Sequence, residues 1–252
     1  MELSCLSQHL YSPREGHLDA IYRIFIYLQK NLGKNPGRME YDPMYEPTYD
    51  NASMVVGRDL DEWKYFYPDA QEMMPRHMPE ALGKYVVIKA YVDANHVGNM
   101  VNSRSHSGII IYVNNAPIIW YIKQNNTVED SSFVSGFVAL RIATEMIESL
   151  RYKLRCFGIP VEGPAEVFCD NMSVVKNSSI PTSALNKIHN AIYYHRFRED
   201  QATGILWVGW IPGEFNLADL FTKITIPRNT RHNLVDSIFS NTESPIGDIE
   251  KA

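Results

Sequence analysis

The chain has 252 residues, of which 45% are hydrophobic, 12% aromatic and 21% charged, a composition typical of globular proteins with one or two domains. Its 24 basic and 29 acidic residues give a formal net charge of −5, which argues against coating nucleic acid by bulk charge but allows a local basic track. The sequence has no apolar run of about 18 residues and no signal-peptide pattern, which argues against membrane and secreted classes. Its three cysteines are too few and too scattered for a metal finger.

The N-terminal part predicts a helix followed by a segment of different character. Apolar residues recur at helical spacing within 9–34, and Gly33 is a plausible stop. Residues 35–84 contain ten acidic and five basic side chains and six of the 14 prolines. This composition favours a partly ordered linker with short helices around 60–67 and 79–83. The alternative is an acidic insertion that docks on a partner.

Three strand patterns follow this segment. Residues 86–94, 108–113 and 116–122 are rich in β-branched and aromatic side chains. Asn114 and Asn115 separate the last two patterns, and asparagine tolerates the positive φ of a tight turn. The sequence therefore predicts an antiparallel hairpin.

The rest of the chain alternates between helix and strand patterns. Ser131 or Ser132 can cap a long helix that ends at the Gly158-Ile159-Pro160 sequence. The later patterns predict a strand at 165–169, a helix at about 183–202, a strand at 205–211 and a last helical segment from near 216. The order β-β-β-α-β-α-β-α predicts an α/β fold with a mixed sheet and flanking helices.

Three aspartates lie where such a fold collects polar groups. Asp93 and Asp170 come at the ends of strand patterns, and Asp219 opens the last helical segment. If the two strands are central and parallel, their carboxyl ends lie side by side. Carboxylates that close raise each other's pKa unless a cation sits between them, and their hard oxygens favour Mg²⁺ or Mn²⁺. The alternative for any one of them is an ordinary turn or cap residue.

Several motifs together resemble the ribonuclease H (RNase H) domain of copia-type (Ty1/copia) retrotransposon Pol polyproteins over roughly residues 85–240. They are YVDA at 91–94, RSHSG at 104–108, Trp120, the serine pair at 131–132, FCDN at 168–171, YH at 194–195 and ADLFTK at 218–223. The N-terminal segment, with Ser12-Pro13 and Tyr27-Leu28, resembles the last helix of the reverse transcriptase that precedes this domain. The chain is thus similar to the carboxyl end of such a polyprotein.

The resemblance implies an RNase H-like mixed five-stranded sheet, in which three antiparallel strands are followed by two parallel additions. It also implies two-metal hydrolysis of the RNA strand of an RNA–DNA hybrid, with Asp93, Asp170 and Asp219 as the catalytic, metal-binding residues and Mg²⁺ or Mn²⁺ as cofactor. A hybrid is recognised through its shape, phosphates and 2′-hydroxyls. The residues expected to contact the nucleic acid are Arg104, Asn171, Arg196, Arg198 and Lys223.

Basic residues at the end of the long helix have two interpretations. Arg151, Lys153 and Arg155 could form part of a phosphate track along the hybrid. Alternatively, they are cations placed favourably near the carboxyl end of a helix. His195 matches a histidine of the family pattern, but we interpret it as a packing or surface residue.

Gly136 is the main departure from the family pattern, because it stands where the family has a catalytic glutamate. Glu145 lies nine residues further on and falls on the opposite side of the helix at roughly 100° per residue. Glu129 and Asp130 precede the cap and could reach the site only if the loop rearranged. We therefore expect weakened metal binding and undetectable or very weak cleavage. The alternative is an inactive RNase H-fold remnant that only binds nucleic acid or associates with reverse transcriptase.

The predicted organisation has four parts. Residues 1–34 are expected to be a helical C-terminal remnant of reverse transcriptase, 35–84 an acidic linker or insertion, 85–240 the RNase H-like domain and 241–252 a disordered tail. The expected partners are an RNA–DNA hybrid and the reverse transcriptase of the same polyprotein, with no membrane association. The expected location is the cytoplasm, in virus-like particles, or the nucleus.

Overall fold

The computed structural model describes residues 59–96, 104–126, 128, 131–182, 191–223 and 225–239, with a few positions between 15 and 26. The predictions for residues 35–58 and 241–252, and for most of 1–34, lie outside the described residues. The elements from β1 to α8 cover Ile88 to Phe239. None of the described helices has the length and hydropathy needed to span a bilayer.

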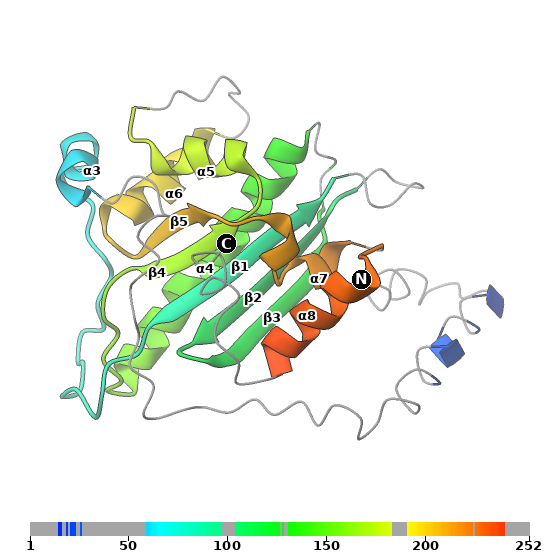
Figure 1. Ribbon diagram of the computed structural model, residues 1–252. Coiled ribbons are helices and arrows are strands. Elements are labelled where there is room, and N and C mark those ends of the chain that lie inside the picture. Colours follow the sequence, from blue (N-terminus) through cyan, green and yellow to red (C-terminus); the bar gives the residue numbers. More distant parts are fainter. Residues whose placement is uncertain are drawn as a thin grey trace.

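A mixed five-stranded sheet organises the chain (Figure 1), and its strand order is β3-β2-β1-β4-β5. The first three strands pair antiparallel, whereas β4 runs parallel to β1 and β5 runs parallel to β4. The strands are β1 (Ile88–Asn95), β2 (His106–Val113), β3 (Ala116–Gln124), β4 (Ala165–Cys169) and β5 (Leu206–Trp210). This arrangement confirms the predicted fold.

The hairpin between β2 and β3 turns at the predicted asparagines. Asn114 has a φ of 53°, the left-handed conformation that asparagine adopts more readily than most residues. Its backbone N–H donates to the Val87 carbonyl oxygen at 2.9 Å, and its side-chain Oδ1 accepts from the Val87 N–H at 3.0 Å. The turn residue therefore also attaches the hairpin to the start of β1.

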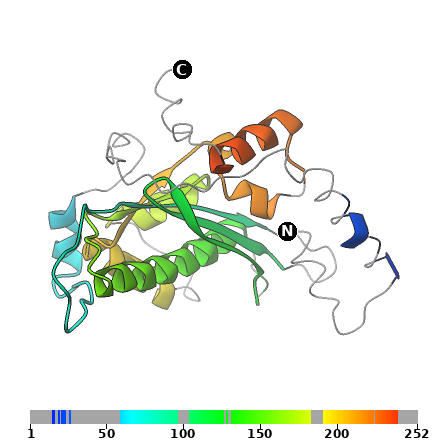
Figure 2. The ribbon, with the colours of Figure 1, turned by 90° about the horizontal axis from the view of Figure 1, so that it is seen from below.

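Helices cover both faces of the sheet (Figure 2), with α4 on one side and α8 on the other. Ser131 caps α4 as predicted, because its hydroxyl accepts from the Val134 N–H at 3.4 Å, and Gly158 follows the end of this helix with a φ of 75°. A large core forms where α4, α5 and α6 meet the sheet, and a smaller one lies under α8. The helices are α3 (Leu60–Phe66), α4 (Ser132–Cys156), α5 (Met172–Ser179), α6 (Ala191–Ala202), the 3-10 turn η3 (Gly213–Phe215), α7 (Asp219–Thr222) and α8 (Arg228–Phe239).

Two helical predictions need correction. The sequence did not predict α5, a short polar helix that begins because the Asn171 side chain caps it by accepting from the Ser173 and Val174 N–H groups. The last helical segment, predicted from near 216, is divided into α7 and α8, and Pro227 lies directly before α8. The described part of the helix predicted at 183–202 is α6.

Residues 59–84, which we call the N-terminal arm, lie against the domain. The Trp63 side chain of α3 is fully buried, and the arm reaches the end of α4, where the Leu82 N–H donates to the Gly158 carbonyl at 2.6 Å. The predicted helix around 60–67 is confirmed. The one at 79–83 is wrong, because these residues form no helix. The described half of the acidic segment is therefore attached to the domain at α3 and at the end of α4, although most of its side chains are exposed.

Candidate metal centre

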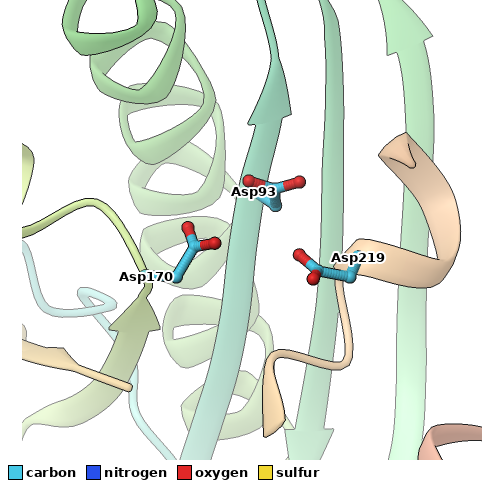
Figure 3. Close-up of side chains that lie close together, drawn as sticks. All are labelled: Asp93, Asp170 and Asp219. Carbon is cyan, nitrogen blue, oxygen red and sulfur yellow. The ribbon is translucent and has the colours of Figure 1, made fainter. Parts of the chain in front are cut away.

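Three aspartates meet near the carboxyl ends of the central strands β1 and β4 (Figure 3), where their ligand oxygens all lie within 4.8 Å of one another. Val92 and Cys169 are partners in the parallel register of β1 and β4, so Asp93 and Asp170 follow at the same edge. Asp219 is the first residue of α7 and reaches this edge after β5. The structure thus brings together the three predicted site residues.

The loop before α7 is fixed to β1 by Asn216, a residue that the sequence analysis did not single out. The fully buried Asn216 side chain donates to the Val92 carbonyl at 3.1 Å and accepts from the Ala218 N–H at 3.2 Å. The Asp219 N–H donates to the Asn216 carbonyl at 3.0 Å. Asn216 therefore sets the position of Asp219 relative to the strand that carries Asp93.

A glycine in β2 allows α7 to approach the sheet. A Cβ atom at Gly108 would lie 2.7 Å from Thr222 Cγ2 and 2.9 Å from Phe221 Cβ, closer than real contacts permit. Asn95 adds a hydrogen bond from its Nδ2 to the Thr222 carbonyl at 2.9 Å. Gly108 and Thr222 belong to motifs of the resemblance, which was the signal that could have identified them as positioning residues.

Burial and mutual repulsion disfavour the ionised form of the carboxyl groups in this site. Burial, followed by the negative charge of Asp170, raises the pKa of Asp93, whose Oδ2 accepts a hydrogen bond from the Thr222 hydroxyl. Burial, followed by the charge of Asp93, raises the pKa of Asp219 to about 7. The Lys223 ammonium lies 2.6 Å from Asp219 Oδ2 and 3.3 Å from Asp170 Oδ2. Although burial alone would lower the pKa of Lys223, these carboxylates raise it.

The donor set fits a hard divalent cation. Among the described residues, Asp219 Oδ1 is buried without a hydrogen-bond partner, so an oxygen with full acceptor capacity remains inside the cluster. Carboxylate oxygens are the ligands that Mg²⁺ and Mn²⁺ prefer. Cys169 does not add a thiolate, because burial raises its pKa to about 12.

Gly136 lies in the second turn of α4 and faces the loop that carries Asp170. A Cβ atom at Gly136 would lie 3.0 Å from Val174 Cγ2 and 3.7 Å from Asn171 Nδ2, so a side chain here would point towards the start of α5. Glu145 is exposed and forms an ion pair with Arg141 at 2.5 Å. The segment with Glu129 and Asp130 lies outside the described residues.

Of the residues predicted to contact nucleic acid, Lys223 and Asn171 lie at the site. Asn171 caps α5 and donates from Nδ2 to the Ser132 carbonyl at 3.4 Å, which joins α5 to the start of α4. Arg104 is half-buried two residues before β2. His195 is exposed on α6 and contacts the Tyr67 hydroxyl at 3.1 Å, in agreement with a surface residue.

Arg198 has an environment that does not agree with a nucleic-acid contact. Its side chain is buried, and its guanidinium lies over the rings of Trp63 and Tyr194 at 5.2 and 4.8 Å. It also donates to the carbonyl oxygens of Ile180 and Pro181. Arg198 therefore holds α3 of the N-terminal arm against α6.

The cations at the end of α4 are also occupied. Arg151 and Arg155 both bind the Glu72 carboxylate, with an Nε–Oε1 distance of 2.7 Å for Arg151 and an Nη2–Oε2 distance of 2.8 Å for Arg155. Arg151 further donates to the Gly163 carbonyl at 2.7 Å. A phosphate track through these two arginines is therefore wrong. The third member, Lys153, remains exposed.

Arg196 lies in a cluster of acids between α4 and α6. Its guanidinium is exposed and lies 2.8 Å from Glu148 Oε1 and 3.7 Å from Asp200 Oδ1. Asp200 is only 3% exposed, and burial together with the neighbouring Glu148 raises its pKa to about 8. These acids compete with phosphate groups for the charge of Arg196. Its contact with nucleic acid stays a prediction.

Asp200→Asn is expected to stabilise the fold at alkaline pH. Between about pH 4 and 8 the folded state binds a proton that the unfolded Asp200 has released, so the free energy of unfolding falls as pH rises through this window. An uncharged side chain should flatten that profile and raise Tm at pH 8 by roughly 2–4 °C, equivalent to about 1 kcal/mol. Thermal melts between pH 5 and 9 measure the difference. As a control, Glu199→Gln at a half-exposed partner of Arg196 should change Tm little. Equal pH profiles of Tm in wild type and Asp200→Asn would contradict the prediction.

The strand order is the one expected of an RNase H-like fold, and the three acids lie at the carboxyl ends of β1 and β4 and at the start of α7. Sequence comparison places this domain in a larger context. The chain is 27% identical over 141 residues to the retrovirus-related Pol polyprotein from transposon RE2 of Arabidopsis thaliana, a match that covers 56% of this chain and 10% of that protein. It is 28% identical over 191 residues to the corresponding polyprotein from transposon TNT 1-94 of Nicotiana tabacum, covering 73% and 14%. These matches confirm the predicted resemblance to copia-type Pol polyproteins, of which the chain spans between a tenth and a seventh.

Solved structures with a similar arrangement include RNase H enzymes. LC11-RNase H1, in a crystal structure with an RNA/DNA hybrid, aligns with a TM-score of 0.44 and 19% identity and covers 55% of this chain and 96% of its own. The N-terminal RNase H domain of rv2228c from Mycobacterium tuberculosis aligns with a TM-score of 0.41 and 12% identity, covering 60% and 98%. No protein-family model matches the sequence.

Proposed function

We propose that this domain acts on RNA–DNA hybrids as an impaired RNase H of a copia-like retrotransposon. The observation that carries the proposal is the meeting of Asp93, Asp170 and Asp219 within 4.8 Å. These three carboxylates would hold Mg²⁺ or Mn²⁺, which when bound supplies an activated water and neutralises charge on the leaving 3′ oxygen. The similarity to retrovirus-related Pol polyproteins supports the hybrid as substrate, because the resemblance found in the sequence implies this substrate.

The chain's own residues would prepare the site for this reaction. Thr222 orients Asp93 through its hydroxyl, and Asn216 holds Asp219 against β1. Lys223 places a positive charge beside two of the carboxylates and lowers their mutual repulsion. What the site lacks is an acid at position 136, and a small misplacement of a water or a leaving group costs orders of magnitude in rate.

The deciding experiment is cleavage of a labelled RNA–DNA hybrid by the full chain with Mg²⁺ and, separately, with Mn²⁺. We expect undetectable or very weak cleavage, and any residual activity should be lost in Asp170→Asn. Cleavage at a rate comparable with ordinary RNase H enzymes would contradict the impairment. Failure to bind the hybrid, measured by fluorescence anisotropy against a duplex DNA control, would contradict the substrate.

Gly136 also favours a second candidate, a non-catalytic module that binds a hybrid or the reverse transcriptase of the same polyprotein. Tyr65, Met73 and Leu82 of the N-terminal arm are exposed, which offers apolar surface for a protein partner. This candidate predicts hybrid binding with no cleavage even at high protein concentration. The predicted cytoplasmic or nuclear location belongs to both candidates and stays a prediction.

A further inference from the structure

Lys223 occupies an unusual place for a basic residue, since its ammonium lies among the carboxylates of the candidate metal centre. Its Nζ is 2.6 Å from Asp219 Oδ2 and 3.3 Å from Asp170 Oδ2. Its backbone N–H also donates to the Asp219 carbonyl at 2.9 Å, which fixes the lysine one turn after this aspartate. The lysine is therefore held to Asp219 through both its main chain and its side chain.

A glycine lies beside the same atoms. A Cβ atom at Gly213 would lie 3.3 Å from Asp170 Oδ2, 3.7 Å from Lys223 Nζ and 3.8 Å from Asp219 Oδ2. The loop between β5 and α7 thus passes close to the contact between the ammonium and the two carboxylates. Because Gly213 has no side chain, this position adds no group that would displace Lys223.

The oxygens of the cluster are unequally occupied. Lys223 binds Asp219 Oδ2 and Asp170 Oδ2, and the Thr222 hydroxyl binds Asp93 Oδ2. Asp219 Oδ1 is buried and, among the described residues, without a hydrogen-bond partner. The Lys223 ammonium therefore already acts as a cation for part of the cluster. The unpaired Asp219 Oδ1 indicates that the cluster also binds a ligand.

Charge balance favours a single divalent ion. When all three aspartates are ionised, they and the Lys223 ammonium sum to −2, which one Mg²⁺ or Mn²⁺ neutralises. A second divalent ion would leave the site at +2, and no carboxylate at position 136 offsets it. Charge that is not balanced is costly where it is buried, as it is at Asp93 and Asp219, so the second ion would bind poorly.

We propose that Lys223 replaces one divalent ion of a two-metal arrangement, so that this domain binds one divalent cation. The inference rests on the proposed function for the metal site itself. It gives Lys223 a role in setting metal stoichiometry, which differs from the nucleic-acid contact expected from the sequence, because it operates without nucleic acid. A divalent ion and the ammonium compete for the same carboxylate oxygens.

The test is titration of the full chain with Mn²⁺ alone by calorimetry, with Mn²⁺ electron paramagnetic resonance as an independent count of bound ions. We expect one ion per wild-type chain. Lys223→Met, which has an unbranched side chain one atom shorter and no charge, should bind Mn²⁺ roughly tenfold more tightly or bind a second ion. Lys153→Met makes the same change at the exposed end of α4 and should behave as wild type.

Each other outcome has a distinct meaning. Two ions in the wild type would overturn the role of Lys223 but not the metal site. Equal stoichiometry and affinity in wild type and Lys223→Met would have the same meaning. If neither protein binds Mn²⁺, or if Asp170→Asn binds as well as wild type, the metal site and hence the proposed function are wrong. Circular dichroism checks that each variant is folded, and Lys223→Gln repeats the test if the methionine variant is not.

Discussion

Gly136→Glu is expected to raise cleavage of an RNA–DNA hybrid by about two orders of magnitude over the wild-type chain, the scale on which misplaced reacting groups cost rate. Gly136 lies on the side of α4 that faces Asn171, the neighbour of Asp170. A glutamate at this position would bring a fourth carboxylate to the start of α5, beside the loop that carries Asp170. The measurement is the initial rate of cleavage of 5′-labelled RNA in the hybrid with Mg²⁺.

The substitution must overcome one steric contact. A Cβ atom at position 136 would lie 3.0 Å from Val174 Cγ2, so the valine has to move by a few tenths of an ångström. Loss of a helical glycine offsets part of this cost, by about 0.5–1 kcal/mol. The double variant Gly136→Glu with Val174→Ala provides the space directly, and we expect it to be at least as active as the single variant.

Gly136→Gln is the matched control, because it has the same size and helix propensity but carries no negative charge. It should remain at the wild-type level. If the glutamine and glutamate variants have equal rates, the missing carboxylate is not the cause of weak cleavage. If all variants, including wild type, cleave rapidly, Gly136 does not impair the enzyme.

Most of the fold could be predicted because the apolar pattern reports directly which elements are buried. The strand predicted at 165–169 agrees with β4 in full, and its five residues are buried on both faces, as expected of a central parallel strand. The β2–β3 hairpin followed from two asparagines. By contrast, α5 depends on the Asn171 cap and has few apolar residues, so its sequence carries little periodic signal.

The candidate site was only partly predictable. Asp93 and Asp170 could be placed together because parallel strands bring their carboxyl ends to one edge. The path of the loop before α7 across the sheet could not be predicted, because no local sequence pattern encodes it. This path determines the roles of Asn216, Gly108 and Gly213. The contact of Lys223 with two carboxylates follows from the same crossing.

The basic residues show why charge alone is a poor predictor of nucleic-acid contact. Arg155 and Arg198 belong to helices with exposed neighbours, yet their partners Glu72 and Trp63 come from the N-terminal arm, far earlier in the chain. The composition of this arm had favoured a linker, with an acidic insertion as the alternative. Cations that appeared available for phosphates are therefore used to attach it.

Glu72→Ala is expected to lower the free energy of unfolding by about 3 kcal/mol, because it leaves two buried guanidinium groups without their shared carboxylate. The side chains of Arg151 and Arg155 are only 4% and 9% exposed, and the Glu72 side chain is 16% exposed. Such a loss corresponds to a fall in Tm of roughly 6–12 °C for a domain of this size. Thermal and urea unfolding, followed by circular dichroism, measure the change.

The pH dependence separates this ion cluster from a general packing defect. Although burial alone would raise it, hydrogen bonds and charges from Arg151 and Arg155 lower the pKa of Glu72 below its usual value. The folded state therefore releases this proton more readily than the unfolded state, so the stabilisation is complete above about pH 4.5 and is lost as pH falls through the lowered pKa. The difference in the free energy of unfolding between wild type and Glu72→Ala should therefore narrow in acid.

Glu80→Ala is the control, because it removes an exposed acid from the same arm. It should leave Tm within about 1 °C of wild type, since substitutions at exposed sites usually change stability little. An equally small change in Glu72→Ala would mean that the arm is not held by this cluster.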